Sequence, residues 1–505
     1  MAKFNKKTSV VPIKKVNAVI SKNPRSQKVV NRAGGESYDE SAKLKLVSLL
    51  LTSFVDDQFY RSEKEGNKEL AKIIAVCDKK FAAKAAIFAR TEFGMRSITH
   101  IVAAEIAKTV KGEEWTSRFF DKVVYRPDDA TEIISFYTNK YGKRPIPNSL
   151  KRGIGKALGR FDEYAISKYR GEGKAFKLVD AVNICHPRPS KALTSLMSGT
   201  LKSADTWEVA MTKAGQEAAE LGESVEDLKE KEWTRLIETR KIGYFALLRN
   251  LRNIAETAPE ALDAALKMLV DEKLIKKSLV LPFRYMKAIE IFSGGKVGFA
   301  AQAVKASPSD QRRIVSALDR ALEISCNNVP KFNGKTLVAL DTSGSMLGRP
   351  AYIGSLFAGI LAKSNNADLI GFSDSSYVIN YNINDSLSTI IKGMKFKSGG
   401  TNFHSIFNVG TIGNQKYERI VILSDMQGWI GYHAPTNELN NYKKRANADP
   451  YIYSWDLQGY GSLMFPENGK KVICLAGFSD KVLDLMRHCE EDKNVLIRKI
   501  EEIVI

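Results

Sequence analysis

Five oxygen-bearing side chains in the last third of the sequence are spaced as ligands of a hard metal ion. They are Asp341, Ser343 and Ser345 in one polar turn, Thr401 after a pair of glycines, and Asp425 at the end of an apolar run. Carboxylate and hydroxyl oxygens are the ligands that Mg²⁺ prefers, and so few of them leave coordination positions for water or for a partner. The pattern predicts a site for a divalent cation, with Mg²⁺ favoured. The alternative is a polar turn that binds no metal.

The residues around this turn do not match the catalytic motifs that also follow a strand. A phosphotransferase with an aspartate nucleophile needs a second aspartate where Ser343 stands, and a phosphate-binding loop needs a glycine where Val329 stands. A serine-hydrolase turn needs glycines at the positions of Asp341 and Ser345. We therefore expect a protein that is not an enzyme.

Short apolar runs that could form strands alternate with helix-like segments after residue 330. The strand-like runs are Thr336–Leu340, Asp368–Phe372, Arg419–Leu423, Pro450–Trp455 and Lys471–Leu475. The helix-like segments are Tyr352–Lys363, Ser386–Gly393, His404–Ile412, Glu438–Ala446 and Ser479–His488. This alternation predicts a doubly wound α/β fold with a parallel sheet, in which ligands bind beyond the carboxyl ends of the strands. The predicted metal ligands stand at such ends.

Residues from about 40 to 326 have a helical pattern, with apolar side chains three and four positions apart and breaks at glycine or proline. The predicted helices are Ser41–Phe54, Lys68–Cys77, Phe81–Glu92, Ser97–Val110, Ala130–Tyr141, Leu150–Phe161, Ala192–Met197, Trp233–Thr239, Ala246–Ala255, Pro259–Asp271, Phe283–Phe292 and Ser309–Cys326. Paired helices with short connections favour an α-solenoid, and an irregular helical array is the alternative.

The 505 residues are too many for one hydrophobic core, and the pattern changes near residue 330. We expect a basic N-terminal segment at 1–32, a mainly α domain of helical repeats at 33–330 and an α/β domain at 331–505. The apolar runs are too short for a membrane span and the N-terminus lacks a secretory pattern, which favours a cytoplasmic protein without a membrane partner. Five scattered cysteines favour neither a disulfide framework nor a zinc site.

The net charge of +20 is concentrated in two segments. Residues 1–32 contain nine basic residues and no acidic one, and residues 140–202 contain fourteen basic and four acidic residues. A focused positive charge of this kind is typical of proteins that bind a polyanion, most often a nucleic acid. A solvated basic surface is the alternative, and for the N-terminal segment the two interpretations are equally good.

Segment 140–202 contains the candidate RNA-binding residues. They form three groups, which are Lys151, Arg152 and Lys156; Lys168 and Arg170 around Tyr169; and His186 and Arg188. The first group can share one face of a helix. In the second group a ring able to stack on a base lies between two cations. His186 lies in a proline turn, where its imidazole could stack on a base or bind a phosphate; a structural histidine is the alternative.

Short motifs in the helical part of the chain, together with the α/β domain that follows it, resemble a known family. They are Asn31-Arg-Ala-Gly-Gly35, Gln58-Phe-Tyr60, Ser167-Lys-Tyr169, His186-Pro-Arg-Pro189 and Ala246-Leu-Leu-Arg-Asn-Leu251. In this order, and followed by the α/β domain, they resemble the Ro autoantigen family, whose RNA-binding module is called TROVE. The set of metal ligands resembles the metal-ion-dependent adhesion site of von Willebrand factor A domains, in which the two serines and the threonine commonly bind the metal directly.

The resemblance implies a ring of HEAT-like helical repeats closed by the A-type domain. It implies that small noncoding Y RNA binds the basic outer surface and that single-stranded 3′ ends of misfolded or decaying RNA enter the central hole. By position, Lys168 and His186 match family residues that contact Y RNA, and Arg170 or Lys174 matches a further basic position. Bacterial members are linked to an exoribonuclease through the Y RNA, so such a partner is expected here.

We therefore expect a non-enzymatic, monomeric RNA-binding scaffold that acts in RNA quality control or degradation. One alternative is a metal-dependent protein-interaction adaptor without specific RNA binding. A weaker alternative is a Mg²⁺-dependent RNA-processing enzyme, because Asp374 and His404 could lie near the metal turn.

Overall fold

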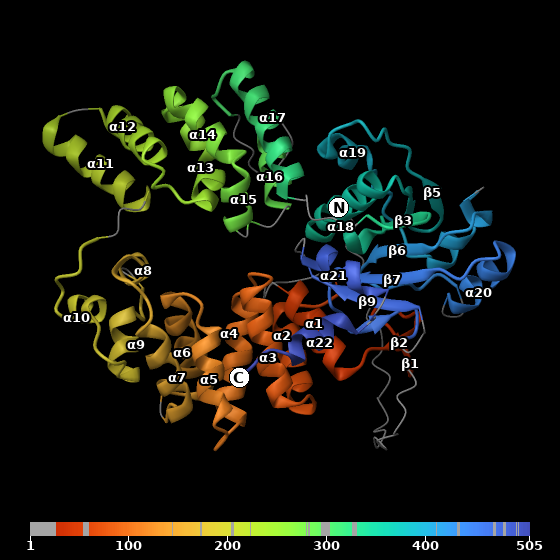
Figure 1. Ribbon diagram of the computed structural model, residues 1–505, viewed down its shortest axis with the longest axis horizontal. Helices are drawn as coiled ribbons and strands as arrows, with labels where there is room; N and C mark the ends of the chain where they lie inside the picture. Colours follow the sequence, from red (N-terminus) through yellow and green to blue (C-terminus); the bar gives the residue numbers. More distant parts are fainter. Residues whose placement is uncertain are drawn as a thin grey trace, which may run out of the picture.

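The computed structural model consists of two helical arms and a C-terminal α/β part (Figure 1). It describes residues 27–53, 60–143, 145–171, 174–203, 207–222, 224–278, 280, 283–293, 304–325, 331–410, 412–431, 435–467, 471–477, 481–490, 492 and 494–505. Most of the predicted basic N-terminal segment, together with Gln58, Phe59 and Cys326, lies outside the described residues. Within the described residues, the helices are too short or too polar to cross a membrane.

The first arm contains α1–α10. Ser41, Ser62 and Asp78 precede α1, α2 and α3, and each accepts a hydrogen bond from a backbone N–H that the helix itself leaves unpaired. The helices are α1 (Ala42–Thr52), α2 (Glu63–Val76), α3 (Lys79–Thr91), α4 (Ser97–Thr109), α5 (Trp115–Val123), α6 (Pro127–Tyr141), α7 (Asn148–Leu158), α8 (Glu163–Lys168), α9 (Leu178–Cys185) and α10 (Lys191–Met197). The sequence pattern does not predict α5, α8 and α9, because such short helices repeat the period too few times.

The second arm contains α11–α17 and returns toward the α/β part (Figure 1). Its helices are α11 (Trp207–Leu221), α12 (Val225–Glu238), α13 (Tyr244–Thr257), a 3-10 turn at Pro259–Ala261, α14 (Leu262–Leu269), α15 (Glu272–Ser278), α16 (Phe283–Phe292) and α17 (Pro308–Ser325). Two buried phenols join three of them: Tyr244 donates to the Leu269 carbonyl at 2.6 Å and accepts from Tyr285 at 3.1 Å. Pairing buried hydroxyls in this way avoids the cost of leaving them without partners.

The C-terminal part contains a six-stranded sheet in the order β5-β4-β3-β6-β7-β9. Its strands are β3 (Thr336–Asp341), β4 (Asp368–Phe372), β5 (Ser376–Val378), β6 (Arg419–Ser424), β7 (Tyr451–Asp456) and β9 (Val472–Ala476). Five strands are parallel and β5 is an antiparallel edge strand. The five predicted strands are thus confirmed within one or two residues at each end, whereas the short β5 lies outside the sequence prediction.

Helices cover both faces of this sheet, because successive side chains of its buried strands point in opposite directions. Val338 and Leu340 of β3 join the core that contains α18, and Leu337 and Ala339 join the core on the other face. The helices are α18 (Arg349–Asn365), α19 (Leu387–Gly393), α20 (Thr436–Arg445), α21 (Lys481–Cys489) and α22 (Val495–Glu501). The expected helix at 404–412 is wrong: 3-10 turns at Phe403–Phe407 and Ile412–Asn414 occupy this stretch, because Gly410 has positive φ.

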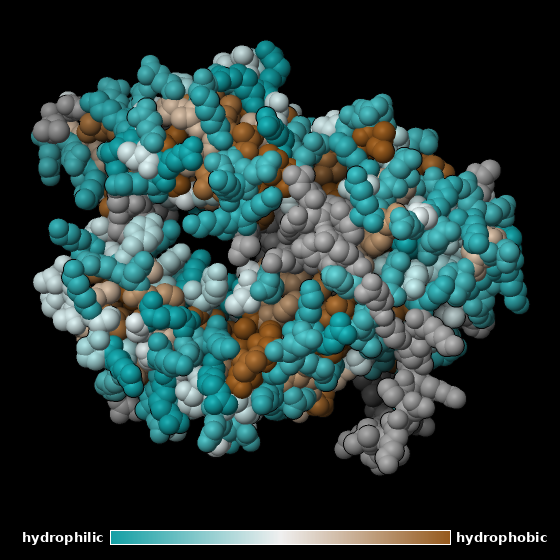
Figure 2. Space-filling model, viewed as in Figure 1, coloured by the Kyte–Doolittle hydropathy of each residue, from teal (hydrophilic) through white to brown (hydrophobic). Residues whose placement is uncertain are grey.

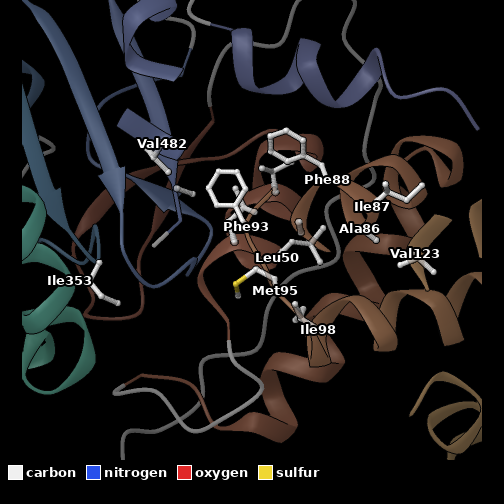
Figure 3. Packing of buried hydrophobic residues seen from close by; sticks show 14 of the residues in the cluster. Leu50, Ala86, Ile87, Phe88, Phe93, Met95, Ile98, Val123, Ile353 and Val482 are labelled. Carbon is white, nitrogen blue, oxygen red and sulfur yellow. The ribbon is translucent and has the colours of Figure 1, made fainter. Parts of the chain in front are cut away.

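Both arms dock on the α/β part, so the chain leaves it along one arm and returns along the other. In the first arm, a Cβ on Gly477 after β9 would lie 3.0 Å from the Phe93 ring, and Figure 3 shows Val482 of α21 beside Phe93. In the second arm, Tyr352 of α18 donates to Glu290 of α16 at 2.9 Å. Figure 2 shows an opening between the two arms.

Residues before α1 also belong to this junction. β1 (Lys28–Val30) pairs with β2 (Glu36–Asp39), and β2 pairs with β8 (Ser462–Leu463) from the α/β part. This three-stranded antiparallel sheet connects residues more than 400 positions apart in the sequence. The α/β part is therefore built from both ends of the described chain.

Asp129 is the polar centre of the first arm. Its side chain is fully buried and accepts hydrogen bonds from Arg90 at 2.9 Å and from His100 at 3.0 Å. It also accepts from the Arg126 backbone N–H at 2.9 Å and from the Arg96 guanidinium at 3.2 Å. Burial alone would raise the pKa of Asp129, but the hydrogen bond from His100 and the charge of Arg90 hold that pKa well below its usual range.

Replacing Asp129 should destabilise the first arm strongly. Asp129→Ala leaves the buried Arg90 without its counter-charge, and we expect a loss of ~3–5 kcal/mol in the free energy of unfolding. Because the folded pKa is depressed, the stabilisation by Asp129 is complete at neutral pH and is lost as the pH falls below about 4. Chemical denaturation at pH 7 and pH 3 measures both effects. The exposed Asp263→Ala is the control, and an equal loss in the two variants would contradict the assignment.

Candidate metal and RNA sites

The predicted metal ligands meet at one edge of the sheet. Asp341 is the last residue of β3, and Asp425 directly follows β6, its parallel neighbour. The carboxyl ends of neighbouring parallel strands lie side by side, so the fold brings these two carboxylates together. The two serines follow in the same turn, with their hydroxyl oxygens 3.3 Å apart. All five predicted ligands, Asp341, Ser343, Ser345, Thr401 and Asp425, are at most 4% exposed.

Backbone hydrogen bonds connect the loop that carries Thr401 to both neighbouring loops. The Gly344 N–H donates to the Gly399 carbonyl at 3.2 Å, and the Trp429 N–H donates to the Thr401 carbonyl at 3.1 Å. Thr401 is thereby fixed between the turn after β3 and the loop after β6. The three segments that the sequence predicts to share a cation therefore form one structural unit.

The residues present fit a bound cation. One carboxylate oxygen of Asp425, Oδ2, is buried and has no hydrogen-bond partner. Burial, followed by the negative charge of Asp341, raises the pKa of Asp425 to about 8. Burial also raises the pKa of Asp341, to about 6. Two buried like charges with an unsatisfied oxygen are costly, and a divalent cation between them would remove that cost.

Two residues that the sequence analysis did not assign to the site hold it in place. Ser424 donates to Asp341 Oδ2 at 2.5 Å, and its position next to Asp425 is the signal that could have identified it. Asp374 Oδ1 accepts from the Gly400 N–H at 2.9 Å. A Cβ on Gly399 would lie 2.1 Å from Asp374, which explains the glycine pair before Thr401. Asp374 thus orders the loop, and His404 packs against Gly431.

Five of the predicted RNA-binding residues lie around α7: Lys151, Arg152, Lys156, His186 and Arg188. Gly155 of α7 packs closely on the His186 turn, because a Cβ at this glycine would lie 2.9 Å from the Cys185 carbonyl. His186 ends α9 in the left-handed conformation, with φ of 46°, and its side chain is exposed. Arg152, Lys156 and Arg188 are exposed as well, and Lys151 is half-buried. Lys156 pairs with Asp121 at 3.0 Å.

The other group surrounds α8, which faces the opening between the arms while α7 lies at the far edge of its arm (Figure 1). Lys168 is exposed, and its ammonium lies 5.6 Å from the ring centres of both Tyr164 and Tyr169. Arg126 lies over the Tyr169 ring at 4.8 Å. Tyr164, which is 49% exposed, is therefore the more accessible ring for stacking. The sequence analysis missed Tyr164, four positions before Lys168 on the same helix face.

Arg170 and Lys174 make contacts within the protein. Arg170 donates to the Leu201 carbonyl at 3.3 Å and to Ser203 at 3.1 Å, and Lys174 pairs with Glu132 at 3.2 Å. The structure therefore divides the eight predicted residues between the α7 edge and the α8 edge of the arm. Both edges belong to the segment with the excess positive charge.

Comparison with known proteins identifies the class of this fold. The TROVE domain model matches residues 40–231 and 200–296, which together cover about half of the chain. The match covers the first arm and the second arm as far as α16. The chain belongs to the TROVE family and is a protein of the Ro autoantigen type, as the motifs in the sequence predict.

Particular relatives share parts of the sequence and most of the fold. The chain is 24% identical over 229 residues to the RNA-binding protein RO60 of Deinococcus radiodurans, and 21% identical over 334 residues to telomerase protein component 1 of the rat. These matches cover 42% and 49% of this chain, and 42% and 13% of the respective relatives. The crystal structure of the Deinococcus radiodurans RO (RSR) protein matches with a TM-score of 0.57 and 17% identity, over 89% of this chain and 100% of that one.

Cation binding should depend on the carboxylates at the sheet edge. At a hundredfold excess over its Kd, Mg²⁺ should raise the free energy of unfolding of the α/β part by ~3 kcal/mol, because it binds only the folded site. A rise in unfolding temperature relative to EDTA measures this. Asp341→Asn should lose the rise, whereas Asp449→Asn, near the amino end of β7, should keep it. A rise of equal size in both variants would show that Mg²⁺ binds elsewhere.

Proposed function

We propose that this protein is a non-enzymatic RNA-binding scaffold of the Ro type. In this proposal, a small, Y-like noncoding RNA binds the basic outer surface of the first arm, and single-stranded RNA ends enter the opening between the arms. The supporting observation is the coincidence of two features in residues 140–202, the segment that contains α7–α10: it belongs to the matched TROVE region, and it carries a net charge of +10. The role would be RNA quality control or degradation.

The exposed cations account for the expected mode of binding. Arg152, Lys168 and Arg188 are exposed, so they can contact phosphates without breaking buried contacts. Phosphate binding releases condensed counterions and depends little on sequence, so recognition would come from the shape of the RNA. Tyr164 beside Lys168 adds a ring on which an unpaired base could stack.

The two edges of the arm suit two kinds of RNA. The α7 edge and the His186 turn lie away from the opening, where a folded RNA has room, whereas α8 faces the opening between the arms (Figures 1 and 2). A single strand exposes its bases and can stack them on an aromatic ring. Lys168 and Tyr164 would therefore contact a single strand at the opening, or the part of a folded RNA that reaches it.

The α/β part would be a von Willebrand factor A-type domain whose cation, Mg²⁺, binds an acidic group of a protein partner. Asp341, Ser343, Ser345, Thr401 and Asp425 would hold the ion, and the ion would supply an open coordination position. Exoribonuclease is the partner class that fits a role in RNA degradation. The protein would act as a monomer, because both of its arms dock on its own α/β part, and it would act in the cytoplasm.

A second candidate function is a metal-dependent protein-interaction adaptor. Two large apolar side chains near the metal loops favour it: Leu347 is 56% exposed and Trp429 is 48% exposed. Trp429 is joined to the Thr401 loop through its backbone, so a partner that binds the cation would also contact its ring. Exposed aromatic side chains of this kind are common anchors in protein interfaces.

The first test is the RNA that copurifies with the protein. Wild type should carry a discrete small RNA, and Lys168→Ala/His186→Ala should lose most of it, because the two residues stand in the two groups of RNA-binding residues. Lys416→Ala/Lys444→Ala, two exposed lysines of the α/β part, is the control and should keep the RNA. Sequencing the bound RNA from each variant measures the effect.

Salt dependence separates this mechanism from others. Affinity for the enriched RNA should fall steeply, by about tenfold or more, over a severalfold rise in salt, as expected when several phosphates are neutralised. No enriched RNA, or the same RNA on the double variant, would favour the adaptor function. Affinity that does not change with salt would contradict phosphate-driven binding.

A nuclease assay tests the absence of catalysis. A labelled single-stranded RNA should stay intact with the purified protein in Mg²⁺ as well as in EDTA. The physical reason is that Asp374 is engaged in the Gly400 loop and the metal turn offers no paired general acid and base. Mg²⁺-dependent cleavage that disappears in Asp341→Ala would instead assign an RNA-processing activity to the site.

A further inference from the structure

A groove with basic rims runs between α14 and α17 of the second arm, two helices that pack against each other. It has a volume of about 610 Å³, and both helices lie on the side of this arm away from the opening (Figure 1). Arg313 of α17 pairs with Asp263 of α14, and also with Asp310 at 3.0 Å. These ion pairs connect the first turns of the two helices and leave the rest of the groove open.

The other three cations that line the groove have no partner. Lys267, Arg312 and Arg320 are exposed, and none of them makes an ion pair or a side-chain hydrogen bond within the part of the chain that the structure describes. Arg312 and Arg320 are eight positions apart on α17, so they share one face of this helix about 12 Å apart along its axis. Lys267 stands on the opposite rim, on α14. The two rims therefore offer three positive charges to a ligand.

The floor of the groove is apolar. Leu266, Val270 and Ala317 are half-buried and lie between the charged rims. None of the described residues that line the groove is aromatic. Single-stranded nucleic acids stack their bases on aromatic rings, whereas an amphipathic helix lays its apolar side chains between two packed helices. The combination of an apolar floor and basic rims therefore favours an acidic peptide over RNA.

We propose that this groove binds an acidic amphipathic helix of a partner protein. Carboxylates seven or eight positions apart on a helix lie about 11–12 Å apart, which matches the separation of Arg312 and Arg320 along α17. Each guanidinium can bind a carboxylate through two parallel hydrogen bonds. Apolar side chains between the two carboxylates would cover Leu266 and Ala317. The groove contains none of the predicted RNA-binding or metal-binding residues, so this inference does not depend on either proposed site.

The test is fluorescence anisotropy of the full chain with a labelled synthetic helix that carries glutamates seven positions apart and leucines between them. A scrambled peptide of the same composition is the matched probe. Wild type should bind the amphipathic peptide about tenfold or more tightly than the scrambled one, because only the former places its carboxylates and leucines on one face. Arg312→Ala/Arg320→Ala should weaken binding about tenfold, the effect of two lost exposed ion pairs.

Lys276→Ala/Lys277→Ala is the control variant, because it removes two exposed charges of α15 that do not line the groove. It should bind the peptide as wild type does. Arg312→Lys/Arg320→Lys keeps the charges and should keep most of the affinity. The unfolding temperature of each variant shows whether it is folded.

Three results would overturn the proposal. One is that wild type binds neither peptide, or binds both equally. Another is that the two alanine variants lose the same affinity for the amphipathic peptide. The third concerns a labelled single-stranded RNA: if Arg312→Ala/Arg320→Ala weakens its binding about tenfold and leaves peptide binding unchanged, the groove is an RNA surface.

Discussion

Two buried carboxylates at the ends of neighbouring parallel strands impose the strongest constraint on this structure. Asp341 and Asp425 are fully buried, so their repulsion is not screened by water. The surroundings offset part of that cost through the hydroxyl of Ser424 and the backbone N–H groups of Ser343 and Gln427. Oδ2 of Asp425 is still without a partner. The proposed cation would supply the positive charge that this edge lacks.

The same edge joins the α/β part to the helical arms. The loop after β6 carries Asp425, and the segments around Asn31 and Arg61 donate hydrogen bonds to this loop and to the loop after β7. The junction is therefore polar at the sheet edge and apolar along α1, α3 and α21, where Phe93 and Val482 pack (Figure 3). Apolar burial supplies most of the stabilisation of this junction, and the directional hydrogen bonds fix where the segments around Asn31 and Arg61 lie on the α/β part.

The proposed functions are physically separate. Excess positive charge lies on α7–α10, at the end of the first arm far from the sheet, whereas the α/β part has almost balanced charge. RNA bound at α7 or α8 would therefore leave the metal edge accessible to a protein partner.

The sequence by itself determined the class of each part and the five candidate ligands of the metal turn. It did so because strand ends and helix caps are local features, set by side chains a few positions apart. It did not determine that Arg61 bonds the loop after β7, that β2 pairs with β8, or that the predicted RNA-binding residues divide between two edges of one arm. Only the tertiary structure decided these, because contacts between residues hundreds of positions apart depend on how packed helices and strands are placed, and neighbouring residues leave no periodic trace of them.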